Sequence, residues 1–314
     1  MCMKSIQAPN AVVMIRPHHF CPNPQTAADN SFQSVDQTRS AQEIAIRARD
    51  EVTTAASMLE AAGVKVRVFD DFSENETPDS VFPNNWFSTH AGGHIALYPM
   101  YSPNRRRERR TDVIDMLKSQ YRVQDVIDYS GLEYDGIFLE GTGAMVLDHI
   151  DRVAYTARSN RANPVALERF CTHFNFEPMA FHSTDMHGRP VYHTNVIMCI
   201  ATEFALVALD MIPDALRRDE MVHRLQQTGR EVIALTEAQI NEFGGNALEL
   251  NTKAPEQTTR VLAMSARAAA SLLPEQRAII EKSAQILPIA IPTIELAGGS
   301  VRCMLAGIHL SARN

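Results

Sequence analysis

The hydrophobic positions of this chain form a repeated pattern. Short apolar runs, bounded by Gly, Asn and Asp, occur in pairs of the kind that β-hairpins show. Four such pairs begin at residues 85, 143, 193 and 245, so their starts lie 58, 50 and 52 residues apart. A further apolar run at 298–310 arrives one period later, and the strand-like segment 11–15 would complete its unit.

Helical patterns separate these hairpins. Apolar residues with helical spacing predict helices at 40–62, 106–120, 164–174, 213–228, 237–243, 265–273 and 274–284. A fixed period of this length is typical of radial or solenoid repeat folds. Because helices alternate with the hairpins, we predict an α/β propeller of five ββαβ units closed around a central site. An ordinary α+β domain whose hairpins resemble one another is the alternative.

Length and composition fit a single large domain. The chain has 314 residues, of which 45% are hydrophobic and 21% charged, which is ordinary for a globular protein with a large core. Length alone would favour two domains. Since no Pro- or Ser-rich linker separates two halves, we expect one domain over residues 1–314.

The charge and apolar distribution exclude several function classes. The net charge of −7 disfavours nucleic-acid or anionic-membrane binding, which needs a basic surface. No apolar run approaches the ~20 residues of a membrane span, and no export signal is recognisable. The arginine-rich run at 105–110 is interpreted as the solvated start of a helix. We expect a small-molecule substrate as the partner and leave open whether the chain forms a homo-oligomer.

The cysteine pattern indicates reduced thiols. The five cysteines are odd in number and widely spaced, and no CxxC pair occurs, so the sequence predicts neither a disulfide framework nor a structural zinc site. A cytoplasmic location fits this usage best. The cysteines are Cys2, Cys21, Cys171, Cys199 and Cys303.

Polar residues gather where the first strand of each predicted hairpin starts. A closed repeat fold would bring these starts to one axis. The set contains a thiol, an imidazole and two carboxylates, which is the inventory of nucleophilic catalysis. Its members are Asp79, Asn84, Glu140, His193, Asn195, Asn246 and Cys303.

The segments around these residues resemble the guanidine-modifying superfamily of arginine deiminases, dimethylarginine dimethylaminohydrolases and amidinotransferases. The similarity extends from residues 16–33 to the C-terminal region, and it is greatest to the citrulline-utilisation hydrolases. The superfamily has a five-unit α/β propeller, the pentein fold. The motifs that carry the resemblance are PDSVFPNNW at 78–86, FLEGTG at 138–143, YHTN at 192–195 and GGSVRCM at 298–304.

The resemblance implies a role for each of four residues. Cys303 would be the nucleophile and His193 the general acid and base. Glu140 would hydrogen-bond the imidazole and fix its tautomer, and Asp79 would accept N–H groups of the substrate head. Such a hydrolase of non-peptide C–N bonds needs no metal or organic cofactor.

Asn195 departs from the superfamily pattern. Deiminases and amidinotransferases have an aspartate there, which gives a guanidinium a second carboxylate. The neutral amide suits a ureido head, so we favour citrulline, converted to ornithine, ammonia and carbon dioxide. Arginine or dimethylarginine is the alternative. The resemblance also places Arg158 on the substrate carboxylate, and Asn30 and Phe32 in an N-terminal segment that covers the site.

Two further readings stay open. His182, Asp185 and His187 lie close together in sequence before His193, and they would be the ligands of a metal-dependent hydrolase. A non-catalytic binding protein on the same fold is the other reading. Each position where the superfamily has a catalytic residue is filled here, which argues against a non-catalytic binding protein.

Overall fold

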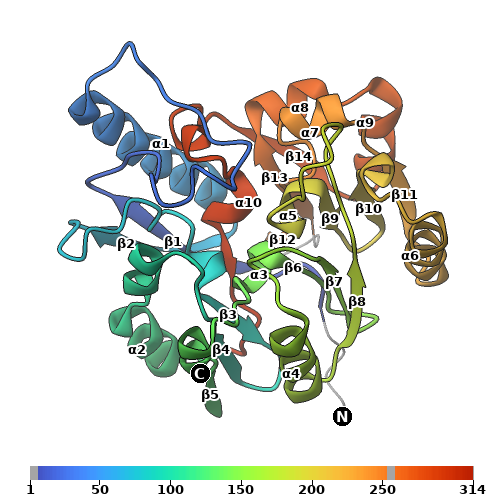
Figure 1. Ribbon diagram of the computed structural model, residues 1–314, viewed down its shortest axis with the longest axis horizontal. Helices are drawn as coiled ribbons and strands as arrows, with labels where there is room; N and C mark the ends of the chain where they lie inside the picture. Colours follow the sequence, from blue (N-terminus) through green and yellow to red (C-terminus); the bar gives the residue numbers. More distant parts are fainter. Residues whose placement is uncertain (1–5, 253–258, 314) are drawn as a thin grey trace.

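Five small sheets surround a central axis in the computed structural model, which describes residues 6–252 and 259–313 (Figure 1). Within those residues each sheet has three strands. In spatial order the sheets are β15 (Ala306–Gly307), β1 (Ala11–Pro17) and β2 (Lys65–Asp71); β3 (Phe87–His90), β4 (His94–Leu97) and β5 (Asp125–Asp128); β6 (Met145–Asp148), β7 (Val153–Ala157) and β8 (Glu177–Phe181); β9 (Met198–Ile200), β10 (Phe204–Val207) and β11 (Glu231–Ala234); and β12 (Leu248–Asn251), β13 (Arg260–Ser265) and β14 (Gln285–Ile289).

Each sheet follows one plan. Its first two strands pair antiparallel, and its third strand pairs parallel with the second. A parallel neighbour requires a crossover, and in each unit one or two helices supply it. The predicted five-unit α/β propeller is therefore confirmed. The helices of these crossovers are α1 (Ala41–Ala61), α2 (Thr111–Gln120), α4 (Pro164–Phe174), α6 (Ala215–Gln227), α8 (Ala266–Ser271) and α9 (Pro274–Ile280), with α7 (Glu237–Asn241) between two units.

The ring closes between distant parts of the chain. Strand β15 pairs antiparallel with β1, with Val12 opposite Gly307, while β2 lies parallel on the other side of β1. The fifth unit therefore combines a hairpin strand from near residue 306 with two strands from the first 71 residues. This is the pairing expected from the apolar runs at 11–15 and 298–310.

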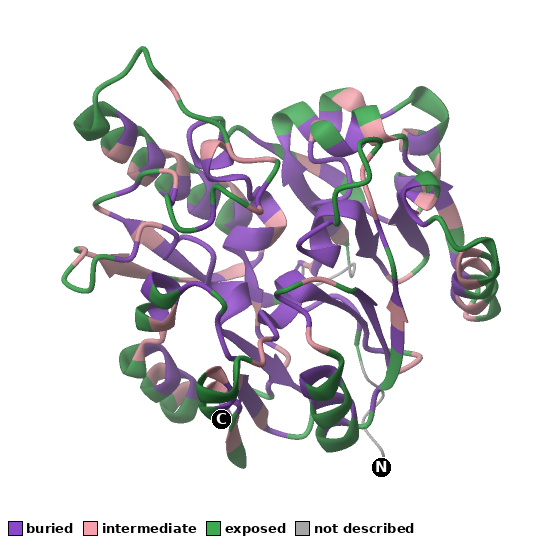
Figure 2. Cartoon of the chain, viewed as in Figure 1, coloured by how far each residue is buried: buried purple, intermediate pink, exposed green. Residues whose placement is uncertain are grey.

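The core lies between the sheets and the outer helices. In β6, β7 and β10 every residue is buried, whereas the outer faces of the helices are exposed (Figure 2). Helix α1 begins with a capping box between Ser40 and Glu43 and buries one apolar stripe. Across the described residues no helix is long and apolar enough to span a bilayer.

Three local predictions differ from the structure. The predicted helix 106–120 begins at Thr111, because residues 103–108 form a separate 3-10 helix, η2 (Pro103–Glu108). The interpretation of the 105–110 run as a solvated face is wrong for Arg105, which is 2% exposed and pairs with Glu108. The predicted first strands also start late, since a helical turn precedes several of them: η1 (Pro83–Asn85), α3 (Gly141–Ala144) and α5 (Thr194–Ile197).

Candidate active site

Short helical turns at the propeller axis hold the candidate catalytic residues. Glu140 is the N-cap residue of α3 and His193 that of α5, while Cys303 lies within α10 (Val301–Met304). Figure 1 shows α3, α5 and α10 close to the centre of the ring. The repeat therefore places residues from three different units side by side.

Glycines in the FLEGTG segment allow this close packing. Gly141 has a φ of +45°, a region that side chains rarely adopt, and a Cβ there would lie 2.5 Å from the carbonyl oxygen of Asn84. A Cβ on Gly143 would lie 2.8 Å from Nδ1 of His193. The motif thus leaves the room that the imidazole needs beside α3.

Glu140 and His193 form a buried pair. Nε2 of His193 lies 2.9 Å from Oε2 of Glu140, and the other carboxylate oxygen accepts the backbone N–H of Tyr101 at 3.0 Å. Both side chains are at most 2% exposed. Burial lowers the pKa of His193, an effect that the bond to Glu140 only partly opposes, so the imidazole is held neutral. This carboxylate can orient the ring and stabilise the imidazolium that forms on proton uptake.

Two buried arginines keep Glu140 ionised. Nη1 of Arg161 lies 3.5 Å and Nη1 of Arg105 3.6 Å from Oε2 of Glu140. Burial alone would raise the pKa of Glu140, but Arg161, the hydrogen bond from His193 and Arg105 outweigh it and hold the pKa well below its usual range. The carboxylate is therefore charged at neutral pH.

Cys303 is buried, and two amides face its sulfur. Nδ2 of Asn195 and Nδ2 of Asn246 each lie 3.3 Å from Sγ. The Asn246 amide also donates to the carbonyl of Asn195 at 2.9 Å, and its oxygen accepts the backbone N–H of Arg302 at 3.0 Å. N–H groups fixed in this way stabilise negative charge on the sulfur.

Asp79 presents a free acceptor to the same cavity. Its Oδ2 accepts an N–H of Asn23 at 2.8 Å and lies 3.7 Å from Nε of Arg105. Its Oδ1 is buried and has no hydrogen-bond partner within the described residues. Burial raises the pKa of Asp79, with Arg105 opposing the shift. A substrate N–H directed at Oδ1 would relieve this desolvation.

The N-terminal segment covers the site. Nδ2 of Asn30 donates to the carbonyl of Ala297 at 3.1 Å, and the backbone N–H of Phe32 donates to Oδ1 of Asn30 at 3.2 Å. Asn30 lines the cavity, whereas the ring of Phe32 packs 5.9 Å from that of Phe243 and 6.4 Å from that of Tyr192. The cavity at Cys303 has a volume of only about 10 Å³, so substrate entry requires these covering residues to move.

The cavity contains two arginines that were not predicted as site residues, Arg105 and Arg161. Arg158 is exposed, and the structure does not bring it to the cavity. Arg161 lies there instead, 1% exposed, with its Nε donating to Oδ2 of Asp29 at 3.1 Å and its guanidinium 4.9 Å from the ring centroid of Tyr192. Arg158 and Arg161 both follow the end of β7, and only the fold shows which of them reaches the cavity. The lining residues are Thr26, Asn30, Asp79, Phe82, Asn85, Arg105, Arg161, Tyr192, His193, Ala297, Gly299 and Cys303.

The alternative metal site is not assembled. His182 and His187 are exposed, and Asp185 accepts Nε of Arg189 at 2.6 Å. Among the residues that the structure describes, no group of three His, Cys, Asp or Glu side chains could hold a metal ion. The four described cysteines are free thiols, and Cys2 lies outside the described residues.

A five-unit propeller with Cys, His and Glu side chains at its axis defines an enzyme of the guanidine-modifying superfamily, a class of hydrolases and transferases of guanidino C–N bonds. The family model described as N,N dimethylarginine dimethylhydrolase, eukaryotic, matches residues 16–310. The chain belongs to this family, and it is a hydrolase of non-peptide C–N bonds. No curated protein sequence matches it significantly.

Solved structures show the same fold at low identity. The N-terminal domain of ArgZ, an arginine dihydrolase from the ornithine-ammonia cycle in cyanobacteria, is 15% identical in its product-bound form, with a TM-score of 0.69 and coverage of 95% of this chain and 97% of that one. A variant of that domain has been solved covalently bound to a reaction intermediate. AgrE with ornithine and NAD⁺ is 17% identical, with a TM-score of 0.72 and coverage of 97% and 40%. A dimethylarginine dimethylaminohydrolase adduct with 4-chloro-2-hydroxymethylpyridine is 12% identical, with a TM-score of 0.61 and coverage of 95% and 99%.

Proposed function

We propose that this chain hydrolyses the terminal C–N bond of a small amino acid with a ureido or guanidino head, through a covalent intermediate on Cys303, and that citrulline is the preferred substrate. The buried set of Cys303, His193 and Glu140 supports the nucleophilic mechanism. The covalent intermediate seen in the ArgZ variant is a precedent on the same fold.

The reaction divides into two steps. His193 takes the proton of the Cys303 thiol, the sulfur attacks the planar ureido carbon, and the bond to the terminal nitrogen breaks. His193 gives the same proton to that nitrogen, which leaves as ammonia. This leaves a thiocarbamate on the sulfur. The same imidazole then takes a proton from water, whose oxygen attacks the carbon and releases the thiolate. The resulting carbamate loses carbon dioxide to give the free amine, so citrulline and water give ornithine, ammonia and carbon dioxide.

The charge of the cavity lining carries the preference for a neutral head. Asp79 is the one carboxylate among the described lining residues, and Arg105 and Arg161 line the cavity with it. The groups that face the sulfur are the uncharged amides of Asn195 and Asn246. Glu108, Glu140 and Asp29 already pair with the two arginines, so a guanidinium would find one unpaired carboxylate oxygen among the described lining residues, Oδ1 of Asp79. A ureido group adds no charge, and its N–H can bind the free Oδ1 of Asp79.

Arg161 is the best-placed residue for the substrate α-carboxylate. Its planar fork currently engages the carboxylate of Asp29, which belongs to the covering segment. A substrate carboxylate has the same shape and charge as the Asp29 side chain and can replace it on the guanidinium. Substrate entry would then be coupled to the release of Asp29 from Arg161.

Guanidino substrates form the second candidate class. The family that matches this chain is described as N,N dimethylarginine dimethylhydrolase, and ArgZ is an arginine dihydrolase. Asp79 would be the carboxylate that receives the guanidinium. With arginine, the same attack would release ammonia and give citrulline, and a second round would give ornithine.

A substrate panel tests the proposal. Purified protein is incubated separately with citrulline, arginine and asymmetric dimethylarginine, and ornithine, citrulline, ammonia and dimethylamine are measured. We expect the highest kcat/KM with citrulline, and loss of turnover in Cys303→Ala. A higher kcat/KM with arginine or dimethylarginine would refute the citrulline preference but leave the thiol mechanism intact. Full turnover by the Cys303→Ala variant would refute the mechanism itself.

A further inference from the structure

A second cavity lies on the propeller axis, separate from the catalytic one. Its volume is about 40 Å³, and it shares no lining residue with the cavity at Cys303. Residues of the first strand of every sheet line it, namely of β3, β6, β9, β12 and β15. It therefore occupies the central channel that the five innermost strands enclose. We call it the rear cavity.

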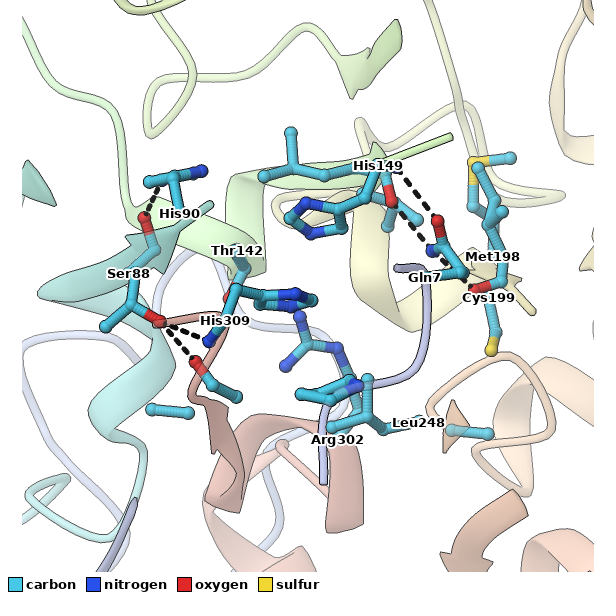
Figure 3. A pocket seen from close by; sticks show the side chains of 18 of the residues that line it. Gln7, Ser88, His90, Thr142, His149, Met198, Cys199, Leu248, Arg302 and His309 are labelled. Atoms are coloured by element: carbon cyan, nitrogen blue, oxygen red, sulfur yellow. Dashed lines mark hydrogen bonds between the residues drawn. The ribbon is translucent and has the colours of Figure 1, made fainter. Parts of the chain in front are cut away.

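The polar lining of the rear cavity combines one cation, Arg302, with neutral side chains that can donate hydrogen bonds. Figure 3 shows the guanidinium of Arg302 pointing into this cavity, toward the imidazole of His309. The ring centroids of His149 and His309 are 3.9 Å apart in a stacked arrangement, and those of His90 and His149 are 6.2 Å apart. None of the described residues that line the cavity is a carboxylate. A full positive charge thus faces a space that lacks an acidic partner.

Arg302 uses little of its donor capacity inside the protein. Its Nη1 donates to the carbonyl of Leu305 at 2.9 Å, which occupies one of five N–H groups. Burial lowers the pKa of Arg302, and the groups that oppose this shift are the thiols of Cys303 and Cys199 rather than any carboxylate. The side chain of Arg302 is half-buried, and a cation that loses part of its water without gaining a counter-charge still loses free energy of solvation. A compensating anion in the cavity would offset this loss.

The histidines are neutral and can act as donors. Burial lowers the pKa of His90 and His149 well below the usual value. Burial and the charge of Arg302 lower the pKa of His309 to about 4. Nε2 of His90 is bound to Ser88 at 2.7 Å, while its buried Nδ1 has no partner within the described residues. The imidazole of His309 already hydrogen-bonds the backbone of Ile6, so the N–H groups that can be directed at an anion are those of His90 and His149.

We propose that the rear cavity binds a small inorganic monovalent anion, held by Arg302 and by N–H groups of His90 and His149. One water molecule needs roughly 10 to 15 Å³ of such a cavity, so the rear cavity has room for about three water molecules. That space fits a halide or an anion of bicarbonate size and excludes a sugar acid or a nucleotide. Arg302 and Cys303 are neighbours in α10, so the anion site adjoins the catalytic turn from behind.

Halide binding gives a direct structural test. Crystals of the wild-type protein are soaked in sodium bromide, and anomalous differences are measured at the bromine edge. We expect a bromide peak in the rear cavity within roughly 3.5 Å of the guanidinium of Arg302. Bromide peaks that occur only on the protein surface would overturn the proposal. This readout does not use enzyme activity, so its result is independent of the substrate proposed above.

Thermal unfolding gives the matching test in solution. Wild type, Arg302→Met, Arg302→Lys and the surface control Arg169→Met are compared in sodium bromide and in sodium gluconate at one ionic strength. An anion that binds only the folded state raises Tm, and we expect bromide to raise Tm by about 2 °C or more in wild type and Arg169→Met. Arg302→Met should lose this difference, while Arg302→Lys keeps part of it. An equal bromide effect in wild type and Arg302→Met would overturn the proposal. If Arg302→Met does not fold, the bromide difference in wild type and the crystal decide.

Discussion

Replacing Glu140 by Gln tests the central claim about the catalytic pair. The substitution keeps the size of the side chain and removes the charge that lies 2.9 Å from Nε2 of His193. The imidazole would still be buried, but its protonated form would lose the carboxylate that stabilises it. In serine hydrolase triads the equivalent Asp→Asn change lowers kcat by about 10⁴-fold. We expect a similar loss here, which corresponds to about 5.5 kcal/mol of transition-state stabilisation.

The same substitution should reduce stability in a pH-dependent way. Arg105 and Arg161 would lose a carboxylate at 3.6 and 3.5 Å. Removing one partner of a buried ion pair costs about 3 to 5 kcal/mol. We expect the low end of that range, because Arg105 keeps Glu108 and Arg161 keeps Asp29. The folded-state pKa of Glu140 is lowered, so its contribution is present above the unfolded-state value of about 4.3 and is lost as the pH falls through the folded-state value.

Two measurements and one control decide this prediction. Ammonia release gives kcat, and denaturant unfolding gives the free energy of unfolding at pH 7 and at pH 4. Glu249→Gln is the control, since Glu249 is 1% exposed and lies 3.4 Å from Arg260 but outside the catalytic cavity. It should lose stability and keep kcat. A folded Glu140→Gln protein with kcat within tenfold of wild type would refute the reasoning.

The other predictions concern substrate choice and binding. Asn195→Asp places a carboxylate beside Cys303, so we expect the ratio of kcat/KM for arginine to that for citrulline to rise at least about tenfold; an unchanged ratio, measured by product analysis, would contradict the charge argument. Arg161→Met should raise KM for citrulline about 10- to 100-fold through loss of the carboxylate contact, whereas Arg158→Met should leave it within about twofold; the reverse order would favour Arg158 as the binding residue. Thiol alkylation should abolish turnover and a chelator should not; the opposite result would restore the metal hypothesis.

The repeat pattern made the fold predictable, and with it the placement of the candidate catalytic residues near one axis. Glu140, His193 and Cys303 each sit where a first strand begins, so their positions along the chain already indicated a common axis. The one-turn helices before those strands were missed. Four residues are too short for a helical pattern to appear in the sequence.

The arginines of the site could not be identified in the same way. Arg105 is one of five arginines within six residues, and only η2 turns it inward toward Glu108 and Glu140. Arg161 reaches the cavity from a loop after β7, three residues beyond the exposed Arg158. Long side chains act at a distance from their own backbone, so strand periodicity gives no information about where their charges lie.

The closure of the ring between β1 and β15 bears on when this enzyme becomes active during its synthesis. Four sheets consist of neighbouring segments and can form as the chain emerges from the ribosome, since local units fold first. The fifth needs β15, which follows directly after the turn that carries Cys303. A nascent chain that ends before β15 therefore has Glu140 and His193 but lacks the strand that fixes the thiol at the axis. Catalysis would begin only when the last unit joins the first. A partly synthesised chain would therefore not yet hold the thiol in a completed site.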